Sequence, residues 1–362
     1  MNHPFLWIRS TLLGILLLTA ACQPIQPEAA QPAAQTTDAQ IQSAMSAAPP
    51  AAAKEATILG WPSEEGGDMV VLREGSNEWT CIADWPASPG NDPSCNDSVW
   101  TAWNDAYAKG EEPEITAPGI AYMLQGGSDP SNTDPMATAP APGEDWVNTP
   151  PHIMILAPGG FDAADFATEP KQDEPYIMWE GTPYAHLMVP VTPMAKDAMG
   201  DTDDVMQNTL SSAPAGIALN ATIMGYPAKE GDPMVVLKEG TNRWICYPDR
   251  TVSPGNDPSC NNANMEAAFA AFTDAVVTKP GLSYMLQGGS DESNFDITAT
   301  GPAAGEDWIT TPPHVMLMVP GGFATDQFTT DHTSGFPYIM FDDTPIEHLM
   351  IPVNTSEMDM NK

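Results

Sequence analysis

Short apolar runs bounded by Gly and Pro recur along the chain and predict strands. In the first half they lie at 56–60, 69–74, 79–82, 119–124, 152–157, 176–179 and 186–191. One segment has helical spacing instead, because Trp100, Trp103 and Tyr107 follow Asn96 or Asp97 as a possible N-cap. We therefore predict an α+β fold, with a mostly antiparallel or mixed sheet of about six or seven short strands and one main helix. An all-β sandwich with a short helix is the alternative.

The whole pattern occurs twice. Residues 56–191 and 221–353 align almost end to end, and SPGNDPSC at Ser88–Cys95 returns unchanged at Ser253–Cys260. The sequence therefore predicts two tandem homologous domains, each large enough for its own core. We expect four flanking parts: a signal peptide at 1–22, a spacer at 23–55, a linker at 192–220 and a tail at 354–362.

The N-terminus has the features of an export signal, with Arg9, an apolar run at 12–18 and small residues before Cys22. The apolar run is too short for a stable membrane anchor. LTAAC at 18–22 resembles the bacterial lipobox. That resemblance implies lipidation of Cys22 and a protein anchored to the cell membrane, facing the periplasm or the cell exterior.

The spacer and the linker differ in composition from the two repeats. Residues 23–55 are mostly Ala, Pro, Gln, Ser and Thr, with too few large apolar groups to offset chain entropy, which predicts a disordered spacer. The acidic segment 192–220 is predicted to be a flexible linker. The formal net charge of −36 disfavours nucleic acid and anionic lipid as partners, and fits either solubility or attraction of cations.

Cysteine positions predict two disulfides. Apart from Cys22 the chain has four cysteines, and Cys81 and Cys95 correspond in the duplication to Cys246 and Cys260. A domain copied whole most simply keeps its bridge within itself, which gives Cys81–Cys95 and Cys246–Cys260. A zinc site is the alternative, but thirteen residues between single cysteines do not form a zinc knuckle. Export also favours disulfides.

Histidine and methionine form the sharpest candidate site. Residues i and i+2 of a strand share a face, so each His-x-Met unit presents an imidazole beside a thioether. This ligand pair selects copper, especially Cu(I), and paired strands would form a His2Met2 site, or His2Met3 with Met178 or Met340. Since methionine also fills cores, a purely structural role is the alternative. The four units are His152-x-Met154, His186-x-Met188, His314-x-Met316 and His348-x-Met350.

Three weaker candidates remain. Ser128 and Ser290 would be the nucleophiles of an extracytoplasmic hydrolase, with His152 or His186 as base, although Gly-Gly-Ser-Asp is not a nucleophile elbow. Oxygens in the loop 126–134 and its copy 288–296 could bind calcium, but turn formation explains them as well. Aromatic residues could line a groove for sugars or peptides, with core packing as the alternative; they are Trp61, Trp79, Trp146, Trp179, Tyr176 and Tyr184.

Two stretches of the first repeat carry a further resemblance. GTPYAHLMVPV at Gly181–Val191 and YMLQGGSDPSNTDP at Tyr122–Pro135 resemble a group of exported bacterial proteins with no assigned activity. The sequence thus predicts a membrane-tethered extracytoplasmic binding protein for a small ligand or a soft metal, with copper first. A hydrolase and a purely structural or adhesive surface module are the alternatives.

Overall fold

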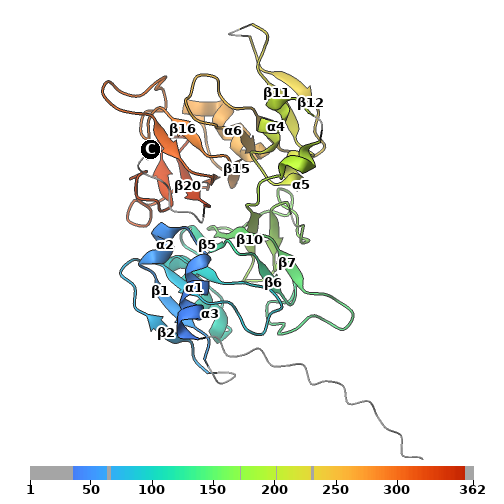
Figure 1. Cartoon of the computed structure of the whole chain (residues 1–362), viewed down its shortest axis with the longest axis vertical. Coiled ribbons are helices and arrows are strands. Elements are labelled where there is room, and N and C mark those ends of the chain that lie inside the picture. The colour runs from blue at the N-terminus through green and yellow to red at the C-terminus, as the bar shows by residue number, and fades with distance from the viewer. Residues whose placement is uncertain (1–35, 63–66, 172, 201, 230–231, 355–362) are drawn as a thin grey trace, which may run out of the picture. The chain divides into compact units, whose positions relative to one another are not determined.

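The chain forms two eight-stranded mixed sheets, one in each repeat, so the predicted α+β class is confirmed. Figure 1 shows the structure, a computed structural model that describes residues 36–62, 67–171, 173–200, 202–229 and 232–354. Strand order is β2-β1-β3-β4-β5-β8-β10-β9 in the first sheet and β12-β11-β13-β14-β15-β18-β20-β19 in the second. The two sheets therefore have the same topology, as the duplication requires.

The first sheet consists of β1 (Thr57–Gly60), β2 (Val70–Arg73), β3 (Thr80–Ile82), β4 (Ser94–Asn96), β5 (Gly119–Met123), β8 (His152–Leu156), β9 (Tyr176–Met178) and β10 (His186–Pro190). The second consists of β11 (Thr222–Gly225), β12 (Val235–Lys238), β13 (Ile245–Tyr247), β14 (Ser259–Asn261), β15 (Gly281–Met285), β18 (His314–Met318), β19 (Tyr338–Met340) and β20 (His348–Pro352). Separate two-stranded ladders pair β6 (Gly127–Asp129) with β7 (Val147–Thr149) and β16 (Gly289–Asp291) with β17 (Ile309–Thr311).

All seven strands predicted for the first repeat are present in its large sheet, and β4 is the eighth strand of that sheet; β6 and β7 were not predicted either. The three residues of β4 include two polar ones, so it lacks the apolar run that marks a strand in the sequence. It is a strand because it lies between β3 and β5 in the sheet.

Part of the predicted spacer is helical, which corrects the prediction of disorder over 37–54. α1 (Thr37–Ser46) and α2 (Pro50–Lys54) pack on the first sheet and bury alanines such as Ala44, Ala47 and Ala52. Figure 1 draws them in blue beside β1 and β2. Alanine has high helix propensity, and its small side chain lets a helix lie close against a sheet, so a composition low in large apolar groups still forms core. Residues 23–35 lie outside the described part.

The predicted flexible linker contains the copy of this helical arm. It includes η1 (Lys196–Met199), α4 (Asp204–Leu210) and α5 (Ala215–Ala218), with Leu210 and Ile217 buried. Each arm is tied to its own sheet by a matching hydrogen bond: Leu124 N–H donates to the Ala47 carbonyl, and Leu286 N–H to that of Ser212. The repeated unit therefore begins near residues 37 and 202, earlier than the sequence alignment indicated.

Both predicted disulfides are present. Cys81 faces Cys95 across β3 and β4, and Cys246 faces Cys260 across β13 and β14, with Cα atoms 3.9 and 4.0 Å apart. All four cysteines are fully buried. Disulfides indicate an oxidising, extracytoplasmic compartment. Cys22 lies outside the described residues.

Each sheet also carries a helix on the face opposite its helical arm, and the N-cap residue of this helix differs between the two repeats. Asp97 caps α3 (Ser98–Lys109), and its carboxylate accepts hydrogen bonds from Trp100 N–H at 2.9 Å and Ile120 N–H at 2.7 Å. Asn262 occupies the same position before α6 (Ala263–Ala271), which is followed by η2 (Phe272–Asp274). Burial raises the pKa of Asp97 to about 7, whereas Asn262 makes the equivalent bonds without a charge.

In the described part of the chain, no helix is both long and apolar enough to span a membrane.

The Asp97 cap predicts a pH dependence of stability. A folded-state pKa raised above the ordinary carboxyl value of 3.8 contributes stability that is present at low pH and is lost as pH rises through about 7. Asp97→Asn should therefore raise the free energy of unfolding at pH 8, by at least about 1 kcal/mol given about 1.4 kcal/mol per pKa unit, and change it little at pH 4. Urea unfolding of the full chain at both pH values measures this.

Asn262→Asp is the matched variant in the second repeat and should lower stability at pH 8 more than at pH 4. Lower stability of Asp97→Asn at pH 8 would show instead that the ionised carboxylate is the better cap.

Because Ala44 in the helical arm has no exposed surface, a larger side chain at this position should lower the stability of the chain. Ala44→Leu should destabilise the chain by about 1–3 kcal/mol through overpacking. Ala39→Leu, at an exposed position of the same helix, is the control and should have little effect. Equal urea midpoints for the two variants would show that the arm does not pack on the sheet.

Candidate functional site

The histidines and methionines singled out in the sequence line one face of each sheet. In the first repeat Met154 lies opposite Met188 across β8 and β10, and the i, i+2 rule places His152 and His186 on the same face. In the second repeat Met316 lies opposite Met350, with the same consequence for His314 and His348. Register therefore brings each set of four candidate ligands onto one surface.

The two histidines of one sheet nevertheless lie at opposite ends of that surface. His152 is opposite Pro190, which is four residues from His186, or about 13 Å at about 3.3 Å per residue. Imidazoles that stand perpendicular to the sheet at that spacing are too far apart to share one ion bonded at about 2 Å. The two histidines of one sheet therefore do not form the shared His2Met2 site that the sequence suggested, and each has its own set of neighbouring side chains.

Each histidine has a methionine directly across from it on the adjacent strand. Met340 is opposite His348, and Met178 is opposite His186. Likewise Met285 is opposite His314 and Met123 opposite His152. Such cross-strand neighbours have Cβ atoms about 4.5–5.5 Å apart, closer than the i+2 neighbours in the same strand.

The tautomer of all four imidazoles is fixed by the backbone. Nδ1 of His348 lies 2.9 Å from the carbonyl oxygen of Ile346, and the other three histidines bond the carbonyl two residues earlier in the same way. A carbonyl oxygen can only accept, so Nδ1 carries the proton and Nε2 keeps its lone pair. Burial lowers the pKa of each imidazole to about 4 and keeps it neutral.

Nε2 of each histidine is buried and has no hydrogen-bond partner among the described residues. A neutral imidazole with a free Nε2 lone pair is the form that binds metals. The same nitrogen could also accept a hydrogen bond from a ligand. The four nitrogens are thus buried acceptors whose hydrogen-bonding capacity is not used by the described residues.

In the second repeat this nitrogen belongs to a residue that lines a cavity of about 590 Å³. The cavity lies between the sheet and α6, and His348 forms part of its wall together with Met316, Met340 and Met350. Phe269 and Ala270 of α6 line the other side. Continuing the register of β18 and β20 by one residue also brings Met318 beside His348, opposite to the side on which Met340 lies.

The equivalent histidine of the first repeat is surrounded by tryptophan. Ring centroids of Trp100, Trp103 and Trp179 lie 5.2, 5.7 and 5.2 Å from that of His186, all nearly perpendicular to it. Aligned positions of the second repeat hold Met265, Ala268 and Phe341.

Around His348 the described ring contacts come from Phe269 at 6.0 Å and Phe341 at 5.7 Å. The replacement of indoles by smaller side chains along the helix accounts for the space beside His348.

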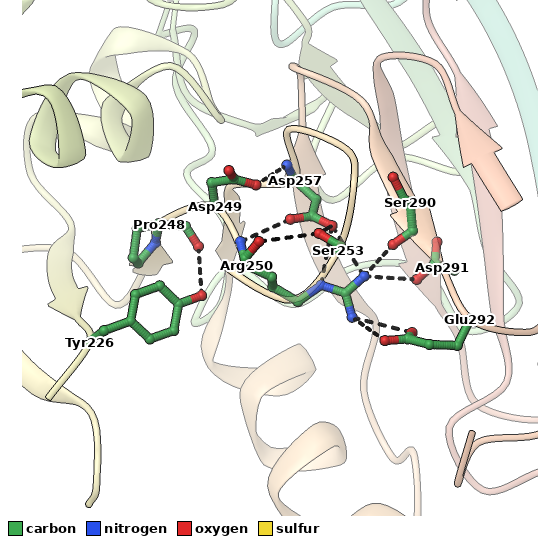
Figure 2. Close-up of polar contacts among 9 residues, drawn as sticks. All are labelled: Tyr226, Pro248, Asp249, Arg250, Ser253, Asp257, Ser290, Asp291 and Glu292. Carbon is green, nitrogen blue, oxygen red and sulfur yellow. Dashed lines mark hydrogen bonds and ion pairs between the residues drawn. The ribbon is translucent and has the colours of Figure 1, made fainter. Parts of the chain in front are cut away.

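The other end of the cavity is charged. Figure 2 shows the guanidinium of Arg250 held by Asp257 at 3.1 Å, by Glu292 at 3.3 Å and by Asp291 at 3.9 Å. Arg250 also donates to the Ser290 carbonyl. Burial raises the pKa of Asp291 to about 6 even though Arg250 opposes the shift. The cavity thus joins a thioether and imidazole end to an ionic end.

The serine candidates are not placed beside a histidine by any hydrogen bond in the described structure. Ser128 Oγ lies 2.9 Å from Oδ1 of Asn148, across β6 and β7. Ser128 and Ser290 are both buried. Gly90 and Gly255 lie so close to the two serine hydroxyls that a Cβ atom added to either glycine would collide with the serine oxygen. The hydrolase alternative gains no geometric support.

The side-chain oxygens proposed for calcium hydrogen-bond the chain itself. Ser131 Oγ accepts from Asp134 N–H at 3.0 Å, and Asp134 accepts from Met136 N–H at 2.9 Å. Asn132 donates to the Thr168 carbonyl at 2.8 Å. The contacts of Ser131 and Asp134 follow the local pattern expected for turn residues, and the Asn132 bond ties the loop to a distant segment. Over the described ranges, His, Cys, Asp and Glu side chains form no group of three or more that could hold a metal.

The aromatic candidates divide between core and surface. Trp79, Tyr176, Trp179 and Tyr184 are buried, as the core alternative expected. Trp61 and Trp146 are half-buried and lie on either side of Trp85, which the sequence interpretation missed. Trp85 aligns with Arg250, and this exchange between the copies was the available signal.

Comparison of the chain with protein-family models, with characterised proteins and with solved structures gave no match.

Proposed function

We propose that this chain is an extracytoplasmic binding protein, tethered through a lipid on Cys22, whose second repeat binds a soft monovalent metal, with Cu(I) as the ion. The observation that carries the proposal is that His348, whose buried Nε2 has no hydrogen-bond partner in the described structure, lines a cavity together with several methionines. Thioether and imidazole ligands together favour Cu(I) over harder cations. The disulfides support the compartment, and the lipobox resemblance suggests the anchor.

Ligand geometry favours Met340 and Met350 as the sulfur donors. Met340 is opposite His348, and Met350 is two residues along the same strand, so both share its face. Unbranched thioether side chains can reorient toward an ion without moving the strands. The fixed Nδ1–H bond to Ile346 orients the imidazole, as a second-shell partner does in known metal sites.

Titration of the full chain with Cu(I), in competition with a chromophoric chelator and with ascorbate as reductant, tests this proposal. We expect one equivalent bound in the second repeat. His348→Ala should remove that equivalent, and the double variant Met340→Leu, Met350→Leu should weaken it at least about tenfold, because Leu keeps the volume and lacks the sulfur.

His332→Ala removes a histidine of the same repeat outside the cavity lining and is the matched control. His186→Ala should also leave this equivalent in place. Unchanged Cu(I) uptake by both the His348→Ala variant and the double methionine variant would contradict the proposal.

A small organic molecule is the second candidate ligand, because a volume of about 590 Å³ far exceeds that of one ion. Cavities of about 300–1,000 Å³ with apolar walls and a few polar groups are typical of small-molecule sites. Displacement of a bound apolar fluorescent dye by candidate molecules in metal-free protein would distinguish this function. Met316→Trp, which fills the cavity, should abolish dye binding.

A further inference from the structure

The first repeat has a partly exposed tryptophan cluster, formed by Trp61, Trp85 and Trp146. The centroid of Trp85 lies 6.3 Å from that of Trp61 and 6.0 Å from that of Trp146. Trp61 is fixed by its indole N–H, which donates to the Ala83 carbonyl at 2.8 Å. The rings thus form a continuous aromatic surface.

Three carboxylates adjoin this surface. Trp85 N–H donates to Asp92 at 3.1 Å, and Asp92 N–H donates to Asp84 at 2.9 Å. Asp129 pairs with Val147, the residue after Trp146. Burial, and then the nearby charge of Asp92, raise the pKa of Asp129. The loop at 84–92, the end of β6 and the start of β7 therefore converge.

In the second repeat the aligned carboxylates lie beside a cation of the chain itself. Asp249, Asp257 and Asp291 align with Asp84, Asp92 and Asp129, and Asp257 N–H donates to Asp249 in the same way. The guanidinium of Arg250 lies against them, 3.1 Å from Asp257 and 3.9 Å from Asp291. Figure 2 shows the guanidinium in contact with Asp257, Asp291 and Glu292, while Asp249 accepts the hydrogen bond from Asp257 N–H.

In the first repeat the residue aligned with Arg250 is Trp85, and no ion pair to Asp84, Asp92 or Asp129 occurs among the described residues. Burial, followed by proximity to the other carboxyls, raises the pKa of Asp92 to about 6 and that of Asp129 to about 7. Asp92 and Asp129 are thus kept in place, whereas the internal cation is replaced by an indole and Glu292, its third acidic partner, by Pro130.

We infer that the surface formed by Trp61, Trp85, Trp146, Asp92 and Asp129 binds a small guanidinium compound in the place that Arg250 fills in the second repeat. The planar guanidinium forms paired hydrogen bonds with carboxylates and stacks on aromatic faces. A ligand with this group would contact both parts of the surface at once. This site is separate from the proposed metal site at His348.

Binding of N-acetyl-arginine-amide to the full chain, followed by tryptophan fluorescence and by indole N–H resonances, tests the inference. N-acetyl-citrulline-amide, which has nearly the same shape without the charge, is the ligand control. We expect at least tenfold tighter binding of the arginine compound, and at least a tenfold loss in Asp129→Asn.

Reciprocal exchange of the aligned residues provides the decisive variants. Trp85→Arg should supply an internal cation and abolish binding, and Arg250→Trp should create a second binding site in the other repeat. Equal affinity for the two compounds, or binding by Trp85→Arg as strong as that of the unaltered chain, would overturn the inference. A gain of binding in Arg250→Trp is a readout that misfolding does not produce.

Discussion

Strand register is the constraint on which the candidate site depends. Because side chains alternate along a strand, a shift by one residue would move every histidine and methionine of β18 and β20 to the opposite face. That face carries the buried disulfide in the neighbouring strands. The pairing of Met316 with Met350 and of Met340 with His348 therefore decides that the thioethers and the imidazole face the helix and the cavity.

The two repeats share one fold but differ in the side chains around their candidate sites. Both repeats keep the disulfide, the helical arm and the imidazole bonded through Nδ1. They differ in two places: indoles surround His186, whereas a cavity adjoins His348, and Trp85 stands where the other copy has Arg250. The shared residues maintain the fold, and the exchanged residues give the two copies different surroundings for the histidine and for the aligned aspartates.

Much of the fold could be predicted from sequence because its signals are local or duplicated. The apolar runs mark seven of the eight strands of the first large sheet, and duplication selects Cys81–Cys95 over other pairings. The arm at 37–54 was missed because small alanines carry little hydrophobic signal, although they are buried by close packing. Disorder was inferred from composition, whereas helix formation depended on contact with the sheet.

The candidate site could be predicted only in part. His-x-Met spacing identified the correct face, but the methionine opposite each histidine depends on pairing between strands distant in sequence, as for Met285 and His314. The cavity depends on differences in side-chain volume across α6 and on the ionic contacts of Arg250. Neither follows from the spacing of residues along one strand.

The central claim is that Nε2 of His348 carries a free lone pair and binds a soft metal. Long-range proton–nitrogen NMR of the full chain at neutral pH measures this directly, since it distinguishes the two imidazole tautomers. We predict that His348 is the Nδ1–H tautomer without metal, and that its Nε2 resonance shifts with one equivalent of Cu(I) while that of His332 does not. A proton on Nε2 of His348, or a Nε2 resonance unchanged by Cu(I), would contradict the account.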